Sequence, residues 1–409
     1  IRHHRGRPGG RAGAGRRVRR RGHRGLQHRH GKRHAGFPGP DHLHAPAVAA
    51  PAQRRGPHLL RRAHPAGRAV HRRSAPRVEA QPGAPGQPGV HLLRRPGARI
   101  LLPAGRRETP EPLDTYGYYD QLSSHPASDL RRDTVLNLAE MGIPVKYSHH
   151  EGAPSQHEID LQYTDALTMA DNVMTARMVI KELAQQQGVY ASFMPKPFST
   201  SNGSGMHTHQ SLFRGNSNAF YDPDDDLHLS VIGKRFIAGL LRHAPEITLV
   251  TNQWVNSYKR LVPGYEAPVH VSWTMSSRLD LIRVPSYKAG YETSLRVEYR
   301  APDPACNPYL AFSALLAAGL KGIEDEYPVP SPITSDVASM SAEERTARGI
   351  GRLPTSMGEA ITLAENSELL RETLGDFVYE TLIRNKKQEW EQYRSTVTDY
   401  EISRYLPLL

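Results

Sequence analysis

Carboxylates that could bind a metal ion occur where this chain is rich in turn-forming residues. Glu151 and Glu158 flank the stretch GAPSQH, in which Gly152 and Pro154 make a tight reversal plausible. Such a reversal would bring the two carboxylates together, and they would repel each other unless a cation or a proton lay between them. Taken alone, the pair could equally be two solvated loop acids.

A histidine-bearing segment follows a glycine-rich turn in NGSGMHTHQS, residues 202–211. If the segment after the turn is a strand, His207, His209 and Ser211 share one face, because side chains alternate along a strand. A lone histidine is more often a structural or surface group than a ligand. Combined with glutamates, one imidazole instead completes a ligand set that suits Mg²⁺ or Mn²⁺.

Five arginines offer planar guanidinium groups for phosphate or carboxylate: Arg260, Arg278, Arg283, Arg296 and Arg300. A strand at 295–300 would place two of them on one face with Glu298, an arrangement that is costly in a buried sheet unless the groups meet metal, phosphate or carboxylate. The alternative is an exposed edge with ordinary ion pairs. Arginines, glutamates and a divalent metal together are typical of phosphoryl transfer. No P-loop or dinucleotide-binding motif is present to account for phosphate binding.

The pattern of apolar residues predicts the elements that must position these groups. Helices are expected at 128–142, 165–187, 227–245 and 307–326, and strands at 143–151, 158–163, 189–197, 268–275, 280–284 and 295–300. Strands of the antiparallel type interleaved with helices indicate an α+β fold.

Residues 1–107 differ from the rest in composition. They hold 26 of the 53 lysines and arginines and two of the 41 acids, a net charge of +24, whereas the remainder carries −12. Dominated by Arg, Pro, Gly, Ala and His, this segment buries too little apolar surface to offset its ordering entropy, so we expect disorder. The segment is either a basic arm that binds nucleic acid or the product of a GC-rich gene translated in the wrong reading frame. The near absence of aromatic residues favours the second explanation, so a nucleic-acid partner is not expected.

Residues 108–409 read as one globular domain. The single cysteine, Cys306, excludes an internal disulfide. No stretch approaches the ~20 apolar residues of a membrane helix, and no signal peptide is visible. We therefore expect a cytoplasmic protein without a membrane partner.

Six ordered motifs resemble the catalytic domain of bacterial type I glutamine synthetase. They are SHHEGAPSQHEID, FMPKP, NGSGMHTHQS, NSYKRLVPGYEAPV, RLDLIRVP and RVEYRAPDPACNPYLAFSALLAAGL, within a similarity that runs from about Thr115 to the C-terminus. The resemblance implies that family's α+β catalytic domain, in which an antiparallel sheet forms an open barrel-like site flanked by helices. Residues 1–107 would then be a frame-shifted remnant of its N-terminal β-grasp domain.

The resemblance also implies an ATP-dependent ligase. Glutamate attacks ATP to give γ-glutamyl phosphate, and ammonia then displaces phosphate to give glutamine, with two Mg²⁺ or Mn²⁺ ions per site. The metal ligands would be Glu151, Glu158, His207 and Glu298. Glutamate would be bound by Asn202, Gly203, Arg260 and Arg300. ATP would be bound by His149, Tyr163, His209, Ser211, Arg278, Arg283 and Arg296. Arg278 and the flap residue Glu266 would be catalytic, with Glu266 closing the site and accepting a proton from the incoming nitrogen.

This sequence departs from the family at its metal ligands and at a regulatory loop. In the family each metal takes a further glutamate from a PEIEFFL-like strand, whereas the corresponding place here reads GARILLPAG. We therefore expect weak metal binding and impaired activity. The loop that carries an adenylylated tyrosine in many members reads ITSDVASMSAEER, which resembles the non-adenylylated actinobacterial paralogues.

Two alternatives stay open. The acceptor could be a polyamine or another amine, as in some actinobacterial paralogues, which would make the enzyme a γ-glutamyl-polyamine synthetase. From a different class, the chain could be an inactive relative with a nucleic-acid-binding basic arm. The family assembles as a dodecamer of two stacked rings, so self-association is implied, although an unrecognisable N-terminal domain would hinder it.

Overall fold

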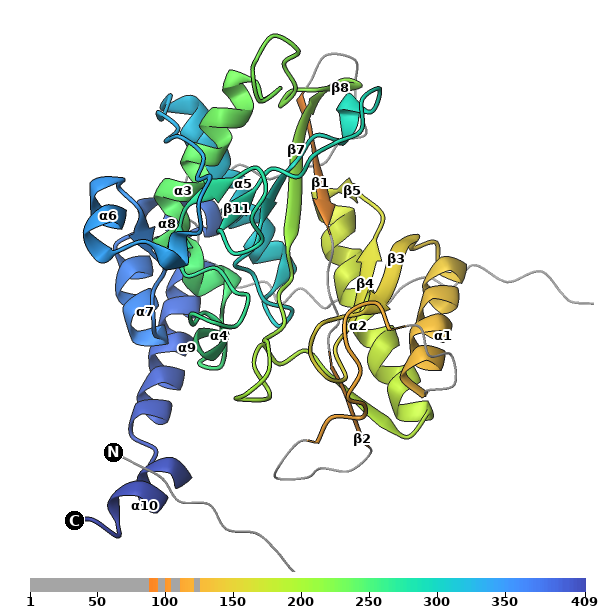
Figure 1. Ribbon diagram of the computed structural model, residues 1–409, viewed down its shortest axis with the longest axis vertical. Coiled ribbons are helices and arrows are strands. Elements are labelled where there is room, and N and C mark those ends of the chain that lie inside the picture. Colours follow the sequence, from red (N-terminus) through yellow and green to blue (C-terminus); the bar gives the residue numbers. More distant parts are fainter. Residues whose placement is uncertain (1–87, 95–99, 104–110, 121–125) are drawn as a thin grey trace, which may run out of the picture. The chain divides into compact units, whose positions relative to one another are not determined.

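The computed structural model describes residues 88–94, 100–103, 111–120 and 126–409 (Figure 1). Two of its strands, β1 (Pro88–Arg94) and β2 (Ile100–Pro103), fall within the segment that the composition predicts to be disordered. Their backbones pair with strands of the globular domain, so the expectation of disorder does not hold for them. The expectation for the rest of residues 1–107, namely 1–87, 95–99 and 104–107, lies outside the described residues.

A seven-stranded sheet forms the centre of the described part of the chain. Its path runs β10 (Trp273–Thr274), β11 (Ile282–Arg283), β12 (Val297–Tyr299), β7 (Thr208–Arg214), β1 and β5 (Thr164–Asp165), with β8 (Ser217–Asn218) paired to β7. The pair β10–β11 is parallel and the other pairs are antiparallel. In Figure 1, β7 is the long strand that lies beside β1.

Three two-stranded sheets accompany it. Strand β3 (Val145–His150) pairs with β4 (His157–Leu161), β2 pairs with β6 (Val189–Ser192), and β13 (Gly351–Arg352) pairs with β9 (His270–Val271). The β3–β4 hairpin matters most for function. Its turn is the reversal expected between Glu151 and Glu158, and it places His149 opposite Glu158 in the antiparallel register.

Helices pack into two hydrophobic cores. One core joins α1 (Pro126–Glu140) and α2 (Ala166–Gln186) to the β3–β4 hairpin. The other joins the central sheet to α3 (Val231–Thr251), α5 (Pro308–Glu324), α7 (Met357–Glu365), α8 (Glu368–Leu374) and α9 (Asp376–Arg394). The remaining short elements are α4 (Ser257–Arg260), η1 (Glu292–Ser294), η2 (Val337–Ser339), α6 (Ala342–Ala347) and α10 (Asp399–Tyr405). None of the described helices is long and apolar enough to span a membrane.

Several helices begin where the sequence offers a side-chain cap. Asp165 accepts hydrogen bonds from the first turn of α2, and Asn307 does the same for α5, which starts with Pro308. Helix α1 buries only part of its apolar residues. Leu130, Thr134 and Leu138 form its buried face, whereas Leu136 lies outside it and is 55% exposed.

Candidate active site

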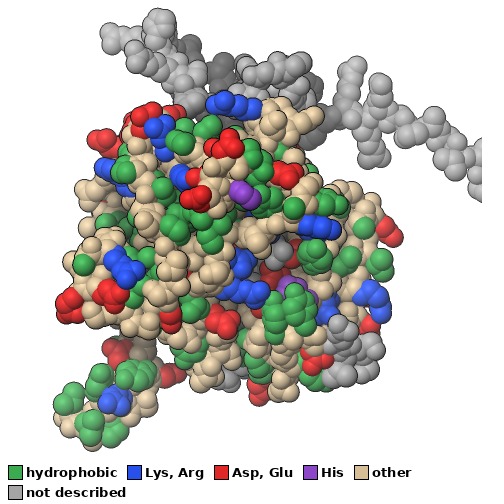
Figure 2. Space-filling model, turned by 45° about the horizontal axis from the view of Figure 1, so that its top comes forward, with side chains coloured by type: hydrophobic (Ala, Val, Ile, Leu, Met, Phe, Trp, Pro, Cys, Tyr) green, Lys and Arg blue, Asp and Glu red, His purple; other side chains and the backbone are tan. Residues whose placement is uncertain are grey.

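An open cavity of about 1500 Å³ lies between the two cores and collects most of the predicted site residues. Figure 2 shows basic, acidic and histidine side chains gathered around a hollow in this face. Thirteen of the sixteen predicted residues line the cavity: His149, Glu151, Glu158, Asn202, Gly203, His207, Arg260, Glu266, Arg278, Arg283, Arg296, Glu298 and Arg300. Segments from 149 to 300 in the sequence thus converge on one space.

One end of the cavity, which we call the acid end, is formed by Glu151, Glu158 and His149 of the β3–β4 hairpin. His149 Nε2 lies 3.2 Å from Glu151 Oε1 and 3.7 Å from Glu158 Oε2. The ligand atoms of the three residues all lie within 4.8 Å of one another. Two carboxylates and an imidazole at this spacing fit a divalent metal ion.

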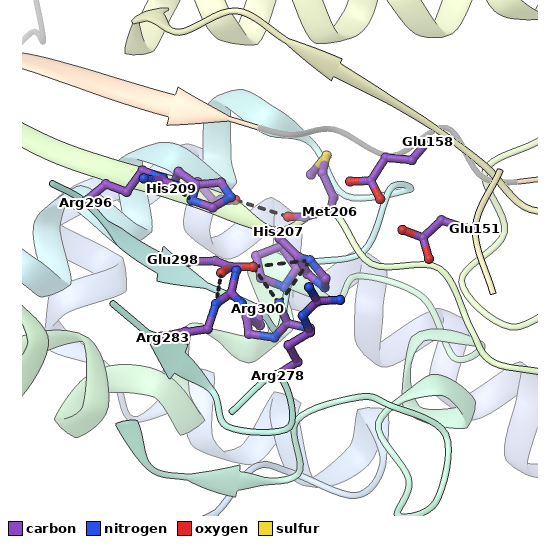
Figure 3. Close-up of polar contacts among 12 residues, drawn as sticks. Glu151, Glu158, Met206, His207, His209, Arg278, Arg283, Arg296, Glu298 and Arg300 are labelled. Atoms are coloured by element: carbon purple, nitrogen blue, oxygen red, sulfur yellow. Dashed lines mark hydrogen bonds and ion pairs between the residues drawn. The ribbon is translucent and has the colours of Figure 1, made fainter. Parts of the chain in front are cut away.

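The other end, which we call the arginine end, centres on Glu298 of β12 (Figure 3). Its side chain is 2% exposed, and its carboxylate accepts from Arg283 Nε at 2.7 Å and from Arg300 Nη1 at 2.5 Å. Burial raises the pKa of this carboxyl, but His209, Arg300 and Arg283 outweigh burial and lower the pKa to about 2. Glu298 is therefore an anion already neutralised by protein cations.

His207 stands just before β7 and points toward the same carboxylate. Its Nδ1 lies 3.5 Å from Glu298 Oε1 and 3.4 Å from Arg300 Nη1. A metal ion bound between His207 and Glu298 would have to compete with the arginines for the Glu298 oxygens. The donor set at this end therefore fits a metal less well than the set at the acid end.

The glycine-rich turn before His207 is packed against Arg260. A Cβ on Gly203 would lie 2.8 Å from Arg260 Cγ and 2.7 Å from the carbonyl oxygen of Pro195. The Arg260 guanidinium is buried, and it donates to the carbonyls of Ala301 and, at 3.0 Å, of Arg300. Arg260 thus braces the turn as well as lining the cavity.

Glu266 is exposed at the cavity edge and adopts a left-handed backbone conformation, with φ of 52°. Such a conformation is strained for a residue other than glycine and is common at functional sites. The neighbouring Tyr265 ring lies under Lys196 Nζ, 3.3 Å from the ring centroid. Across the cavity wall, Arg278 Nη1 donates to the Tyr118 hydroxyl at 3.4 Å.

Three predicted residues do not line this cavity. Tyr163 follows β4 and is 55% exposed. Ser211 is buried, and its hydroxyl donates to the carbonyl oxygen of Leu295 at 3.0 Å. His209 is buried opposite Glu298 in the register of β7 and β12, and its Nδ1 accepts from Arg296 Nε at 3.2 Å.

Comparison with known proteins identifies the domain. The family model "Glutamine synthetase, catalytic domain" matches residues 87–405. The chain belongs to the glutamine synthetase family. The match begins upstream of residue 108, the domain boundary expected from composition, and includes β1 and β2.

Glutamine synthetases of several organisms are similar in sequence. The enzyme of Mycolicibacterium smegmatis is 56% identical over 317 residues, which are 78% of this chain and 70% of that protein. The enzyme of Thermotoga maritima is 46% identical over 311 residues, covering 76% of this chain and 70% of that protein. Among solved structures, GmaS, a γ-glutamylmethylamide synthetase, in complex with ADP has a TM-score of 0.70 at 30% identity, covering 78% of this chain and 73% of that one.

Several cavity residues of this glutamine synthetase family member were missed by reasoning from the sequence. Gln156 donates from Nε2 to the Gly203 carbonyl and to Ser204 Oγ, both at 3.1 Å, and so ties the hairpin turn to the glycine-rich turn. Tyr118 contacts Arg278 from a segment with no motif of its own. The glycine spacing in NGSG was a usable signal for Gly205, whose missing side chain makes room for His207 and Arg260.

Proposed function

We propose that the cavity is the active centre of an ATP-dependent glutamate–ammonia ligase, the activity of the family to which the chain belongs. The observation that carries this proposal is the convergence of two clusters of carboxylates and arginines on one cavity. An anionic phosphoryl group and a carboxylate substrate both require such cations, and divalent metal requires such carboxylates. A metal ion bound there would neutralise phosphate charge as the phosphoryl group transfers.

The proposed roles follow from position in the cavity. Glu151 and Glu158 would hold one divalent ion, and His207 with Glu298 a second. Arg278, Arg283 and Arg296 would contact the ATP phosphates together with His149, while Asn202, Gly203, Arg260 and Arg300 would bind glutamate. Tyr163, His209 and Ser211 lie outside the cavity, so their proposed contacts with ATP would depend on a different arrangement of the nucleotide-binding side.

The reaction would proceed in two displacements. A γ-carboxylate oxygen of glutamate attacks the γ-phosphorus of ATP, and the bond to ADP breaks. The nitrogen of ammonia then attacks the acyl carbon, phosphate leaves, and Glu266 accepts the proton that the nitrogen loses. Glu266 is on an exposed loop at the cavity edge. Closure of this loop over the cavity would exclude water that otherwise hydrolyses the acyl phosphate.

We also propose that this chain is impaired because its first segment was read in the wrong frame. Residues 96–100 read PGARI. Codons that encode these residues, read one nucleotide later, can spell Pro-Glu-Leu-Glu followed by Phe or Tyr. This is the pattern expected for the family's glutamate-bearing strand, and it would place glutamates at positions 97 and 99, which lie outside the described residues. Sequencing the encoding DNA in all frames checks the assignment.

The acceptor is proposed to be ammonia. The sequence relatives named glutamine synthetase support this choice, whereas the structural similarity to GmaS supports only a related member of the family. From the family resemblance we further propose self-association into stacked rings with sites between adjacent subunits.

Phosphate release tests the function. The chain is incubated with ATP, Mn²⁺ and glutamate, and phosphate is measured with ammonium, putrescine or methylamine as acceptor. We expect slow release that requires glutamate and is stimulated most by ammonium. Glu266→Gln should lower the ammonium-stimulated rate by roughly a hundredfold, within the range for loss of a general base. Release that is independent of glutamate would contradict the proposal, and stimulation by putrescine alone would replace ammonia with a polyamine.

A further inference from the structure

A buried cluster of ionisable side chains lies directly behind the acid end. Asp114, His150 and His157 are each less than 10% exposed at their side chains. Asp114 precedes α1, His150 ends β3 and His157 begins β4. Because His150 directly precedes Glu151 and His157 directly precedes Glu158, the cluster lies at the base of the turn that carries both carboxylates.

The contacts of the cluster determine where its protons lie. Arg131 Nη1 is 2.7 Å from His157 Nδ1, and a guanidinium only donates, so this nitrogen accepts. The proton of neutral His157 must then be on Nε2, which faces Asp114 Oδ2 at 3.5 Å. Among the described residues, neither of these two buried atoms has another hydrogen-bond partner. They therefore face each other as donor and acceptor.

His150 is held between two acceptors. Its Nδ1 lies 2.6 Å from the carbonyl oxygen of Glu151, and its Nε2 lies 3.0 Å from Asp114 Oδ1. A chain of polar contacts thus runs from Arg131 through His157, Asp114 and His150 to the backbone of Glu151.

The same three side chains have ligand atoms close enough for a metal ion. The contact with Arg131 is not compatible with metal binding by His157. A metal on Nε2 of His157 would require the proton on Nδ1, where the Arg131 guanidinium already donates. The hydrogen-bonding pattern therefore fits a structural brace better than a metal site.

Asp114 also holds the turn between the two glutamates. Ser155 in this turn has φ of 56°, a conformation that a residue other than glycine keeps only when its surroundings enforce it. Asp114 Oδ1 accepts from the Ser155 amide at 2.6 Å, and the Asp114 amide donates to Ser155 Oγ at 2.8 Å. The Glu151 amide closes the turn by donating to the Gln156 carbonyl at 2.6 Å.

We propose that Asp114 is a positioning residue for the metal-binding carboxylates. Its contacts with Ser155, His150 and His157 hold the turn and the adjoining ends of β3 and β4 in place. They thereby set the distance between the carboxylates of Glu151 and Glu158. It would act without touching substrate or metal. The inference rests on the proposed function only for the metal-binding role of these glutamates.

The test combines two measurements on the full chain carrying Asp114→Asn. The side-chain amide introduced at position 114 would place an N–H donor opposite the N–H of His157 Nε2. The substitution also removes the carboxylate charge that pairs with His150. We expect the Glu151 amide to exchange with solvent at least about tenfold faster, because the turn opens locally. We expect Mn²⁺ affinity, measured by paramagnetic resonance of the free ion, to fall roughly ten- to a hundredfold, as for other partners that orient metal ligands.

Matched variants separate positioning from general destabilisation. Glu246→Gln breaks another carboxylate–histidine contact, with His243 on α3, outside the cavity, and should leave both readouts unchanged. His157→Gln can still accept from Arg131 and donate to Asp114, so it should retain Mn²⁺ affinity, whereas His157→Leu should lose it. This pair also decides the matter if Asp114→Asn does not fold.

Unchanged exchange at Glu151 in Asp114→Asn, or equal Mn²⁺ affinity in the two His157 variants, would overturn the inference. Failure of the unaltered chain to bind Mn²⁺ would instead count against the proposed function. In that case the exchange rate of the Glu151 amide alone decides whether Asp114 holds the turn.

Discussion

The two ends of the cavity hold their carboxylates in opposite ways. At the acid end, Glu151 and Glu158 share a histidine, His149, and stand at the tip of a hairpin braced from behind. At the arginine end, Glu298 is on a buried strand between Arg283 and Arg300. The first arrangement brings two carboxylates together around one imidazole, whereas the second holds one carboxylate between two guanidinium groups.

This difference indicates how a second carboxylate, if it were present, would change metal binding at the arginine end. One glutamate beside two guanidinium groups is a satisfied ion pair, and a metal ion gains little by displacing either arginine. A further carboxylate would offset the second guanidinium charge and give the metal an oxygen ligand besides those of Glu298, while the arginines stay available for phosphate. The missing glutamates should therefore weaken metal binding more at the arginine end than at the acid end.

Restoring those glutamates should have the largest effect. In Gly97→Glu with Arg99→Glu, we expect tighter Mn²⁺ binding and a rise in glutamate-dependent phosphate release of roughly a hundredfold or more, because a well-held metal contributes several kcal/mol to phosphoryl transfer. Titration with Mn²⁺ and a phosphate-release assay measure the two effects. The matched control is Gly97→Gln with Arg99→Gln, which has similar side-chain volume without the charge. Equal behaviour of the two double variants would break the comparison between the ends.

Removing the carboxylate at each end should affect stability differently. Glu298→Gln leaves two arginines without their anion, and we expect a loss of about 3 kcal/mol in the free energy of unfolding at neutral pH. Glu151→Gln, at the more accessible acid end, should cost about 1 kcal/mol or less. Urea unfolding of both variants measures the contrast, and similar losses would show that the ends do not differ.

The pH dependence of the Glu298 effect has a definite sign. Folding lowers the pKa of Glu298 from 4.5 to about 2, so its contribution is present above about pH 4.5 and disappears as the pH falls toward 2. The difference in stability between the unaltered chain and Glu298→Gln should therefore shrink over that range. A difference that stays constant down to pH 2 would show that charge is not its cause.

Much of the fold follows from patterns that are local in the sequence. Asp165 and Asn307 mark the starts of α2 and α5, and alternation placed Glu298 of β12 on one face with Arg300, which directly follows that strand. The hairpin between Glu151 and Glu158 was also predictable, because Gly152 and Pro154 favour a reversal.

What could not be predicted depends on contacts between distant segments. Asp114 stands in PEPLDTYG, where nothing in the local pattern indicates that it will meet Ser155, 41 residues away. The guanidinium of Arg260 was expected to bind substrate, yet it also bonds backbone carbonyls at residues 300 and 301. Arg260 has both roles because its guanidinium is buried against this backbone, and a single sequence does not reveal which side chains are buried.

A glycine at each end gives the smallest and most local contrast. A Cβ on Gly205, at the arginine end, would lie 2.8 Å from His207 Nε2 and would also overlap the Arg260 guanidinium, whereas a Cβ on Gly152, at the acid end, has nothing within 4 Å. Arg260 is buried and bonded to backbone carbonyls, so it has no room to move aside. We expect Gly205→Ala to cost about 2 kcal/mol, as overpacking does, and Gly152→Ala to change stability by less than about 1 kcal/mol.

Thermal unfolding and glutamate titration of the two alanine variants measure this contrast. Gly205→Ala should also weaken glutamate binding, because a shift of Arg260 or His207 moves cavity groups directly. If Gly205→Ala is as well tolerated as Gly152→Ala, the arginine end is more plastic than its buried ion pairs indicate. A metal ion could then displace Arg283 or Arg300 from Glu298 by a small movement, and the second metal position would not need the missing glutamate.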